Sequence, residues 1–191
     1  MNQRDKWKKF IPVMAILAIA VILVLIVKIS GEPLSVDTIV KYTPKNVALA
    51  VIMLILLFGL KSLTIVLPLS ILYLASGILF SPVAAVFIST VGLSVSITIP
   101  YCLGKCSGKQ ITEEIFQKYP KAKKLSDYQK QNTFFTCFIT RIVGFLPGDI
   151  VSLYFGACDV NYLIYLVAGI SGSLLSIVTT TLLGEKLNNP F

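Results

Sequence analysis

Residues 134–159 read FFTCFITRIVGFLPGDIVSLYFGACD, so one arginine and a Pro-Gly-Asp triplet interrupt a run that is otherwise apolar. An arginine at bilayer depth costs about 2.5 to 3.5 kcal/mol on insertion scales, so Arg141 is expected to face a polar cavity or a partner rather than lipid. Pro147 removes a backbone donor and Gly148 permits a turn, which predicts two short helices that dip into a membrane and return. Such irregular backbone is tolerated at that depth only where protein buries it or water reaches it.

Asp149 follows the predicted turn and is expected near the N-cap of the returning helix. There its carboxylate would accept hydrogen bonds from unpaired backbone N–H groups and meet the positive end of the helix dipole. The role of the arginine remains open at this point. Arg141 either holds the hairpin in shape, by pairing with Asp149 or by capping backbone carbonyls, or it binds a ligand within the membrane.

The composition excludes an ordinary soluble domain, because 55% of the 191 residues are hydrophobic, 14% are charged and the mean hydropathy is +0.84. These values predict an all-α polytopic membrane protein. The sequence contains no histidine, which removes the usual metal ligand, the usual proton shuttle and any Ser-His-Asp triad. We therefore expect neither an enzyme nor a bound metal or cofactor, and the four cysteines fit buried apolar positions better than a zinc site.

The net charge of +8 is concentrated in two basic clusters, which the positive-inside rule places in the cytoplasm. A basic loop between apolar spans serves topology and lipid headgroups far more often than nucleic acid, so we expect membrane lipids and no nucleic acid as partners. Residues 110–131 predict two short amphipathic helices broken at Pro120, either on the inner leaflet or as a solvated connector. The clusters are Arg4, Lys6, Lys8 and Lys9, and then Lys105, Lys109, Lys118, Lys121, Lys123, Lys124 and Lys130.

The chain is expected to divide into three parts. Residues 10–29 form an apolar run long enough to cross a hydrocarbon core about 30 Å thick, and no A-x-A-like cleavage site follows, so a signal anchor is favoured over a cleaved signal peptide. The parts are a cytoplasmic N-terminus with signal anchor and external linker over 1–46, a membrane domain over 47–184, and a short external tail over 185–191.

The topology of the membrane domain follows from counting crossings. Residues 82–104 are long enough to span and end at the basic cytoplasmic loop 105–133, so they must begin outside. The preceding residues 47–80 therefore enter and leave on the external side. They make either two crossings or, as we favour, a helix followed by a re-entrant hairpin at about 62–80 around Pro68.

The two regions that contain these prolines share a spaced pattern. Both read L-P-x-x-I-x-x-L-x-x-G, and a shift of 79 positions superimposes them. The first copy would enter the membrane from outside and the second, at about 134–159, from inside. This predicts an inverted repeat with two oppositely oriented re-entrant helical hairpins plus spanning helices, with the hairpin tips near the midplane where transporters bind substrates. The superimposed pairs are Pro68 with Pro147, Ser70 with Asp149 and Gly77 with Gly156.

Several of these residues together resemble the VTT-domain family, also called SNARE-associated Golgi proteins, of the DedA superfamily. The resemblance covers about residues 50–180. It implies two oppositely oriented re-entrant hairpins and the movement of lipids between leaflets: flipping of polyprenyl phosphate or phospholipid in bacterial members, and phospholipid scrambling in eukaryotic ones. The motifs that carry it are Gly77-Ile-Leu-Phe80, Tyr101-Cys-Leu-Gly104-Lys105-Cys-Ser-Gly108, Phe138-Ile-Thr-Arg141, Pro147-Gly-Asp149 and Gly156.

One feature departs from the family pattern. Some bacterial members are thought to couple transport to protons through acidic residues in the membrane, but the first predicted hairpin of this chain contains no Asp or Glu. Only Asp149 and Asp159 remain to exchange a proton. An energy-independent scramblase would lose nothing by this absence.

We therefore interpret the chain as a membrane lipid transporter, a flippase or a scramblase that moves phospholipid or polyprenyl phosphate between leaflets. Arg141, with Lys61 from the other hairpin, would present positive charge to a lipid phosphate in a hydrated groove, because a guanidinium stays charged and grips phosphate oxygens in pairs. The residues expected to couple transport or to stabilise the hairpins are Asp149, Pro147, Gly148, Pro68, Ser70, Gly77 and Gly156.

Two other functions remain open. A proton- or cation-coupled transporter of a small solute would need the Asp149 carboxylate, and a non-transporting membrane scaffold would act through the basic loop. The expected location is a bacterial cytoplasmic membrane, because no organelle retention signal is visible at the C-terminus. Self-association into a homo-oligomer is also left open.

Overall fold

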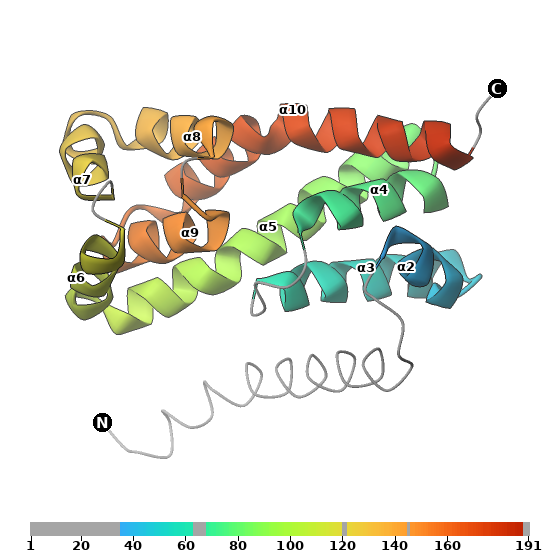
Figure 1. Cartoon of the computed structure of the whole chain (residues 1–191), viewed down its shortest axis with the longest axis horizontal. Coiled ribbons are helices and arrows are strands. Elements are labelled where there is room, and N and C mark those ends of the chain that lie inside the picture. The colour runs from blue at the N-terminus through green and yellow to red at the C-terminus, as the bar shows by residue number, and fades with distance from the viewer. Residues whose placement is uncertain (1–34, 63–67, 120–121, 145, 189–191) are drawn as a thin grey trace, which may run out of the picture.

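The computed structural model describes residues 35–62, 68–119, 122–144 and 146–188, and every regular element in these ranges is a helix (Figure 1). The all-α class predicted from the sequence is confirmed for this part of the chain. The signal anchor predicted at 10–29 lies outside the described residues. In chain order the helices are α2 (Val36–Tyr42), α3 (Val47–Lys61), α4 (Leu69–Leu79), α5 (Pro82–Ser107), α6 (Lys109–Lys118), α7 (Ala122–Gln131), α8 (Thr133–Val143), α9 (Gly148–Ala157) and α10 (Tyr162–Asn188).

Helices α5 and α10 are, among the described residues, the two that are long and apolar enough to cross a membrane. They contain 26 and 27 residues, which corresponds to about 40 Å at 1.5 Å per residue. Figure 1 shows that they run in opposite directions and cross. Large apolar side chains on both helices are open to the surroundings, with Val83 83% exposed and Leu175 77% exposed. Such surfaces suit contact with lipid better than contact with water.

Four shorter helices form two broken pairs, α3 with α4 and α8 with α9. Their lengths of 15, 11, 11 and 10 residues correspond to about 15 to 23 Å, which is less than the thickness of a bilayer core. In Figure 1 the end of α3 and the start of α4 face the middle of the molecule, and the break between α8 and α9 faces the middle from the opposite direction. The two pairs therefore point toward each other.

Glycine and proline set the boundaries of these short helices. Gly144 ends α8 in the left-handed conformation, at φ 59° and ψ 24°, which a residue without a side chain adopts at little cost. Pro147 is the N-cap residue of α9 and Pro68 is the N-cap residue of α4, and both have extended backbone. The prolines thus start the second helix of each pair, as the shared pattern predicted.

Asp149 lies near the N-cap of α9 as predicted, but the prediction that its carboxylate caps backbone N–H groups is wrong. Asp149 lies in the first turn, where its charge still meets the positive end of the helix dipole, but its carboxylate accepts hydrogen bonds from a lysine rather than from backbone N–H groups. Ser70, its counterpart in α4, likewise lies after the N-cap position. In both helices a proline occupies that position, so neither N-cap offers a side-chain hydrogen bond.

Glycines bring α4 onto α10 and α9 onto α5. A Cβ atom at Gly77 would overlap the carbonyl oxygen of Thr181 in α10, and one at Gly156 would overlap the carbonyl oxygen of Tyr101 in α5. Only a residue without a side chain allows two helix backbones to approach so closely. Gly77 and Gly156 are equivalent positions of the shared pattern, so each short helix uses its glycine in the same way.

A glycine on each long helix completes the same two crossings. A Cβ atom at Gly184 would overlap the carbonyl oxygen of Leu74, and one at Gly104 would overlap the carbonyl oxygen of Leu153. Leu74 and Leu153 are equivalent positions 79 residues apart, and Gly104 and Gly184 lie 80 residues apart. The internal similarity therefore extends from the short helices to the long helices that they contact.

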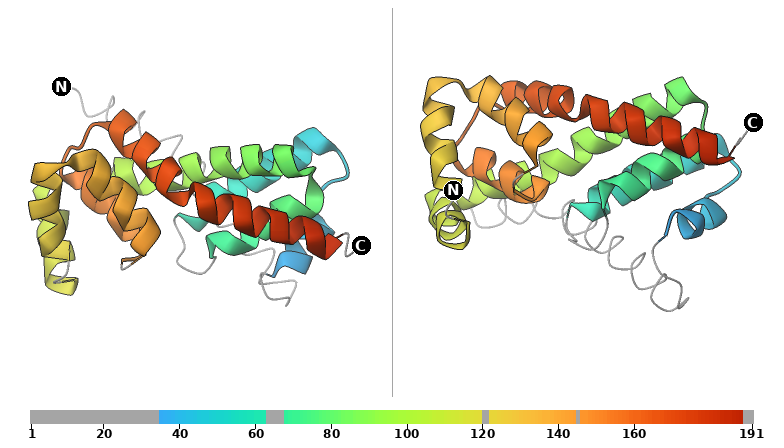
Figure 2. Two further views of the ribbon diagram at one scale, coloured as in Figure 1. Left: turned by 90° about the horizontal axis from the view of Figure 1, so that it is seen from above. Right: turned by 45° about the horizontal axis from the view of Figure 1, so that its top comes forward.

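Helices α6 and α7 lie at one end of the molecule, opposite α2 and the C-terminal end of α10 (Figure 2). They confirm the two short helices predicted over 110–131. Ile115 of α6 is buried, and the ring of Phe116 packs against Tyr154 of α9 with 5.9 Å between centroids. Leu125 of α7 is also buried, and α7 contacts α8. Part of their apolar side therefore covers the second broken pair.

Replacement of Gly156 by alanine is expected to destabilise the protein. The added Cβ would meet only backbone atoms of α5, which cannot move aside cheaply, and overpacking of this kind costs about 1 to 3 kcal/mol. The matched control is Gly59→Ala in α3, where the Cβ would lie 3.6 Å from the side chains of Val95 and Ile99. Thermal unfolding of the purified protein in detergent should show a lower midpoint for Gly156→Ala alone. Equal midpoints for the two variants would contradict the close packing of α9 on α5.

Candidate functional site

An ion pair joins the end of α3 to the start of α9. The Lys61 Nζ donates to both carboxylate oxygens of Asp149, at 2.8 Å to Oδ1 and 2.7 Å to Oδ2. The two side chains are 10% and 23% exposed, so both charges are largely removed from water. The sequence placed Lys61 and Asp149 on different hairpins, and the structure brings them together as direct partners.

Arg141 lies near the end of α8 and forms hydrogen bonds across the break between α8 and α9. Its Nη1 donates to the carbonyl oxygen of Gly148 at 3.1 Å, and its Nη2 donates to the Ser152 Oγ at 2.8 Å and to the Tyr165 hydroxyl at 2.9 Å. Ser152 and Tyr165 are fully buried, so their positions are fixed by packing. Of the two structural roles considered for Arg141, the structure shows the capping of a backbone carbonyl and not an ion pair with Asp149.

The tyrosine extends this network to α5. Its hydroxyl donates to the carbonyl oxygen of Ile97 at 3.0 Å, so a chain of hydrogen bonds runs from Arg141 through Tyr165 to the middle of a long helix. Pro100 lies inside α5 three residues further on and has no N–H to offer the preceding turn. The chain of hydrogen bonds therefore ends close to the turn of α5 in which Pro100 removes one backbone hydrogen bond.

Glycines make room for the arginine. A Cβ atom at Gly172 of α10 would lie 2.9 Å from the Arg141 Cβ, and one at Gly148 would lie 3.0 Å from its Nη1. At Gly169 a Cβ would lie 3.8 Å from its Nε. The side chain of Arg141 is thus enclosed by backbone on the side of α10 while remaining partly exposed.

The charges of the site do not cancel. Lys61 and Asp149 neutralise each other, and within the described part of the chain no carboxylate forms an ion pair with Arg141. A guanidinium has five N–H donors, of which three are used by the hydrogen bonds given above. One N–H on Nη1 and the Nε–H remain without a hydrogen bond to a described residue. Among the described residues, the positive charge of Arg141 is therefore not neutralised by a carboxylate.

The pattern glycines and Asp159 lie elsewhere in the molecule. Gly77 and Gly156 serve the helix crossings, and Ser70 is exposed on α4. Asp159 pairs with Lys105 at 2.8 Å, but the side chains are 76% and 55% exposed. An exposed pair of this kind contributes little to stability.

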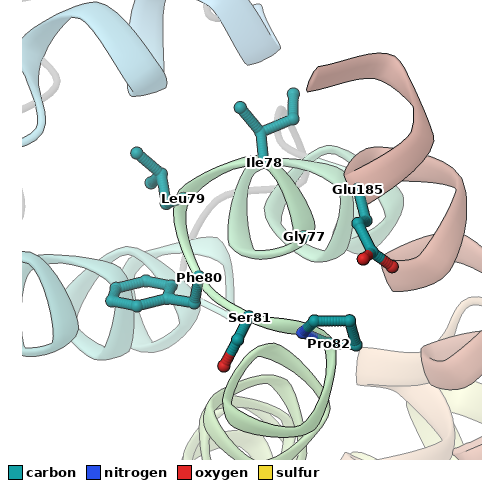
Figure 3. A pocket seen from close by; sticks show the side chains of 7 residues that line it. All are labelled: Gly77, Ile78, Leu79, Phe80, Ser81, Pro82 and Glu185. Atoms are coloured by element: carbon teal, nitrogen blue, oxygen red, sulfur yellow. The ribbon is translucent and has the colours of Figure 1, made fainter. Parts of the chain in front are cut away.

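A separate pocket of about 320 Å³ lies at the turn between α4 and α5 (Figure 3). Neither Lys61, Arg141 nor Asp149 contributes to it. The one charged side chain at this pocket is the Glu185 carboxylate, which would repel a phosphate. The pocket is lined by Gly77, Ile78, Leu79, Phe80, Ser81, Pro82 and Glu185.

Sequence reasoning missed three residues of the site. Ser152 lies four positions after Gly148 and thus on the same face of α9, a spacing that could have marked it. Tyr165 and Pro100 occur singly in apolar helices, and no spacing connects them with Arg141. Their roles depend on contacts between helices that lie far apart in the sequence.

A family model described as the VTT domain matches residues 67–186, which is more than half of the chain. Arg141, Pro147 and Asp149 lie within the matched region, whereas Lys61 precedes it. No curated protein and no solved structure matches the chain.

The ion pair between Lys61 and Asp149 is expected to couple the two residues energetically. Lys61→Met or Asp149→Asn alone leaves an uncompensated charge that is largely out of water, whereas the double variant leaves none. A double-mutant cycle on thermal unfolding should therefore give a coupling of about 1 to 3 kcal/mol. The control is the same cycle on Lys105 and Asp159, which should be additive because that pair is exposed. Additive effects at Lys61 and Asp149 would refute the pairing.

Proposed function

This chain belongs to the VTT-domain family of membrane proteins, and on that basis we propose that it moves lipids with phosphate headgroups between membrane leaflets, as a flippase or scramblase. The observation that carries the proposal is Arg141, a cation held beside a helix break with two donors unused and no acidic partner among the described residues. An intramembrane charge without a partner marks a functional site by default.

The proposed membrane placement is an inverted repeat with two re-entrant hairpins, α3–α4 and α8–α9. Three observations support it: the short helices cannot span a bilayer, their breaks face each other, and equivalent glycines pack equivalent helices. α5 and α10 would span, and the basic region with α6 and α7 would lie in the cytoplasm. The ion pair and Arg141 would then lie near the midplane.

In this mechanism the headgroup moves through the protein while the acyl chains stay in lipid. The phosphate would accept a hydrogen bond from one of the two unused donors of Arg141, the Nε–H or the remaining Nη1–H, which point to different edges of the guanidinium, since charge-assisted hydrogen bonds to a guanidinium are strong and directional. Ser152 and Tyr165 hold the guanidinium in place, so little side-chain entropy is lost on binding. Membrane lipids are the proposed partners, and the proposed location is a bacterial cytoplasmic membrane.

A coupled transporter of a small solute is a second candidate. Protonation of Asp149 would remove its charge from the pair with Lys61 and loosen the contact between α3 and α9, which is the kind of change that coupling requires. For this candidate Asp149→Asn should abolish solute flux. For a lipid transporter the same variant should still exchange lipid. A scaffold would instead bind its partners through α6 and α7. Two results together would favour it: no lipid exchange by the wild type, and loss of partner binding when α6 and α7 are replaced.

Exchange of a headgroup-labelled phospholipid in vesicles that contain the purified protein tests the lipid proposal. Arg141→Met should reduce the rate about 10- to 100-fold, because a hydrogen bond to a charged group contributes about 1.5 to 3 kcal/mol. Arg141→Lys keeps the charge without the planar fork and should give an intermediate rate. Lys105→Met, which alters an exposed pair, should match the wild type.

The outcome is decisive only at matched incorporation and with folding checked by thermal unfolding of each variant. Equal rates for wild type and Arg141→Met would remove Arg141 from the mechanism. No exchange by the wild type of zwitterionic, anionic or polyprenyl-phosphate lipid would refute lipid transport itself.

A further inference from the structure

We infer that the Lys61–Asp149 pair sets the charge of the headgroup that the site accepts, so that it favours a phosphodiester, with one negative charge, over a phosphomonoester. This inference rests on the proposed function and concerns the selectivity of the same site. It follows from a count of charges, from their positions and from the cost of an unbalanced charge in a medium of low polarity.

The charge count is simple because the surrounding helices are almost uncharged. Within their described ranges, α4 has no charged residue, α3 has only Lys61, α8 has only Arg141 and α9 has only Asp149. The charged residues of α5 and α10 all lie at the C-terminal ends of these helices. The centre of the domain therefore contains two positive charges and one negative charge. The positive charges belong to Lys61 and Arg141, and the negative charge belongs to Asp149.

The hydrogen bonds connect these three charges to the start of α9. Arg141 donates to the carbonyl oxygen of Gly148, and the next residue, Asp149, is the acidic member of the ion pair. Asp149 engages Lys61 through both carboxylate oxygens. Lys61 is consequently occupied, and the net charge available to a ligand is that of Arg141 alone.

A single net positive charge matches one class of headgroup. A phosphodiester carries one negative charge and would leave the site neutral. A phosphomonoester has a second ionisation with a pKa near 6 and carries about −1.5 to −2 at pH 7, which would leave about half to one uncompensated negative charge. Such a charge is costly away from water, so monoesters are disfavoured, and of the lipids considered above phospholipids with a diester headgroup are favoured over polyprenyl phosphate, which is a monoester.

The same count predicts how the selectivity changes. Asp149→Asn releases Lys61 and raises the net charge of the site to two, which matches the monoester. Lys61→Met lowers it to zero, which matches neither lipid. The double variant restores a net charge of one without the ion pair, and it should recover the wild-type preference for the diester. A loss of stability in the single variant would also be reversed by the second substitution, but it would lower the exchange of both lipids alike, whereas a charge-based mechanism changes the ratio of the two rates.

The experiment measures leaflet exchange of two lipids labelled on an acyl chain, phosphatidylglycerol as the diester and phosphatidate as the monoester, in the same vesicles at pH 7.5. The wild type should exchange phosphatidylglycerol faster. Asp149→Asn should raise the rate ratio of phosphatidate to phosphatidylglycerol by about tenfold or more, given the strength of charge interactions at partly buried sites. The double variant should return the ratio to within about threefold of the wild type, because its net charge is again one.

The outcomes separate this inference from the proposal on which it rests. An unchanged ratio in Asp149→Asn, with lipid exchange intact, would overturn charge selection alone. No exchange of either lipid by the wild type would overturn the proposed function. If Asp149→Asn unfolds, the double variant still tests the inference, since loss of the preference for the diester in that variant would overturn it.

A soluble ester separates a lipid headgroup from a free phosphoester. Vesicles loaded with radiolabelled glycerol 3-phosphate, a monoester without acyl chains, should retain their contents with the wild type and with Asp149→Asn. Release of the soluble ester by Asp149→Asn without exchange of phosphatidate would show that the site accepts the free ester and would overturn the lipid assignment.

Discussion

The contact between Lys61 and Asp149 links two helix pairs that are otherwise held apart. Neither α3 nor α4 packs extensively on α8 or α9; each pair is instead attached to the long helices α5 and α10. The ion pair therefore fixes where α9 begins relative to α3. Gly148, whose carbonyl Arg141 caps, directly precedes Asp149 in the chain, so the ion pair and the guanidinium both contact the start of α9. Because both charges of that pair are largely removed from water, neither is left unpaired without a large cost.

The features that could be predicted from the sequence are those set by local chemistry. The turn around Pro147 and the start of α4 at Pro68 follow from what proline does to a backbone, and the polar contacts of Arg141 follow from the cost of a charge in lipid. The short helices over 110–131 follow from their spacing of apolar residues. The pattern glycines were also found from sequence, although their contact with the opposite long helix was not.

The partners of the charged groups could not be predicted. Asp149 is eight residues from Arg141 and 88 residues from Lys61, and spacing alone favours the nearer cation. The observed choice depends on how two separate helix pairs are docked, which is a tertiary property. The hydrogen bond from Tyr165 to Ile97 has the same origin, since it joins α10 to α5. The error over the hydrogen bonds of Asp149 has the same origin, because its carboxylate pairs with Lys61 of α3 and not with the backbone N–H groups at the start of α9.

The glycine crossings determine the order in which the chain can assemble. α4 packs on α10, and α9 packs on α5, so each half of the domain supplies the surface that the other half needs. During synthesis Gly77 emerges about 100 residues before Thr181, the residue on which it rests. α4 can therefore pack on α5 early, but its contact with α10 forms only after the last helix has been made. The packing of the N-terminal half of the domain is thus completed by the C-terminal half.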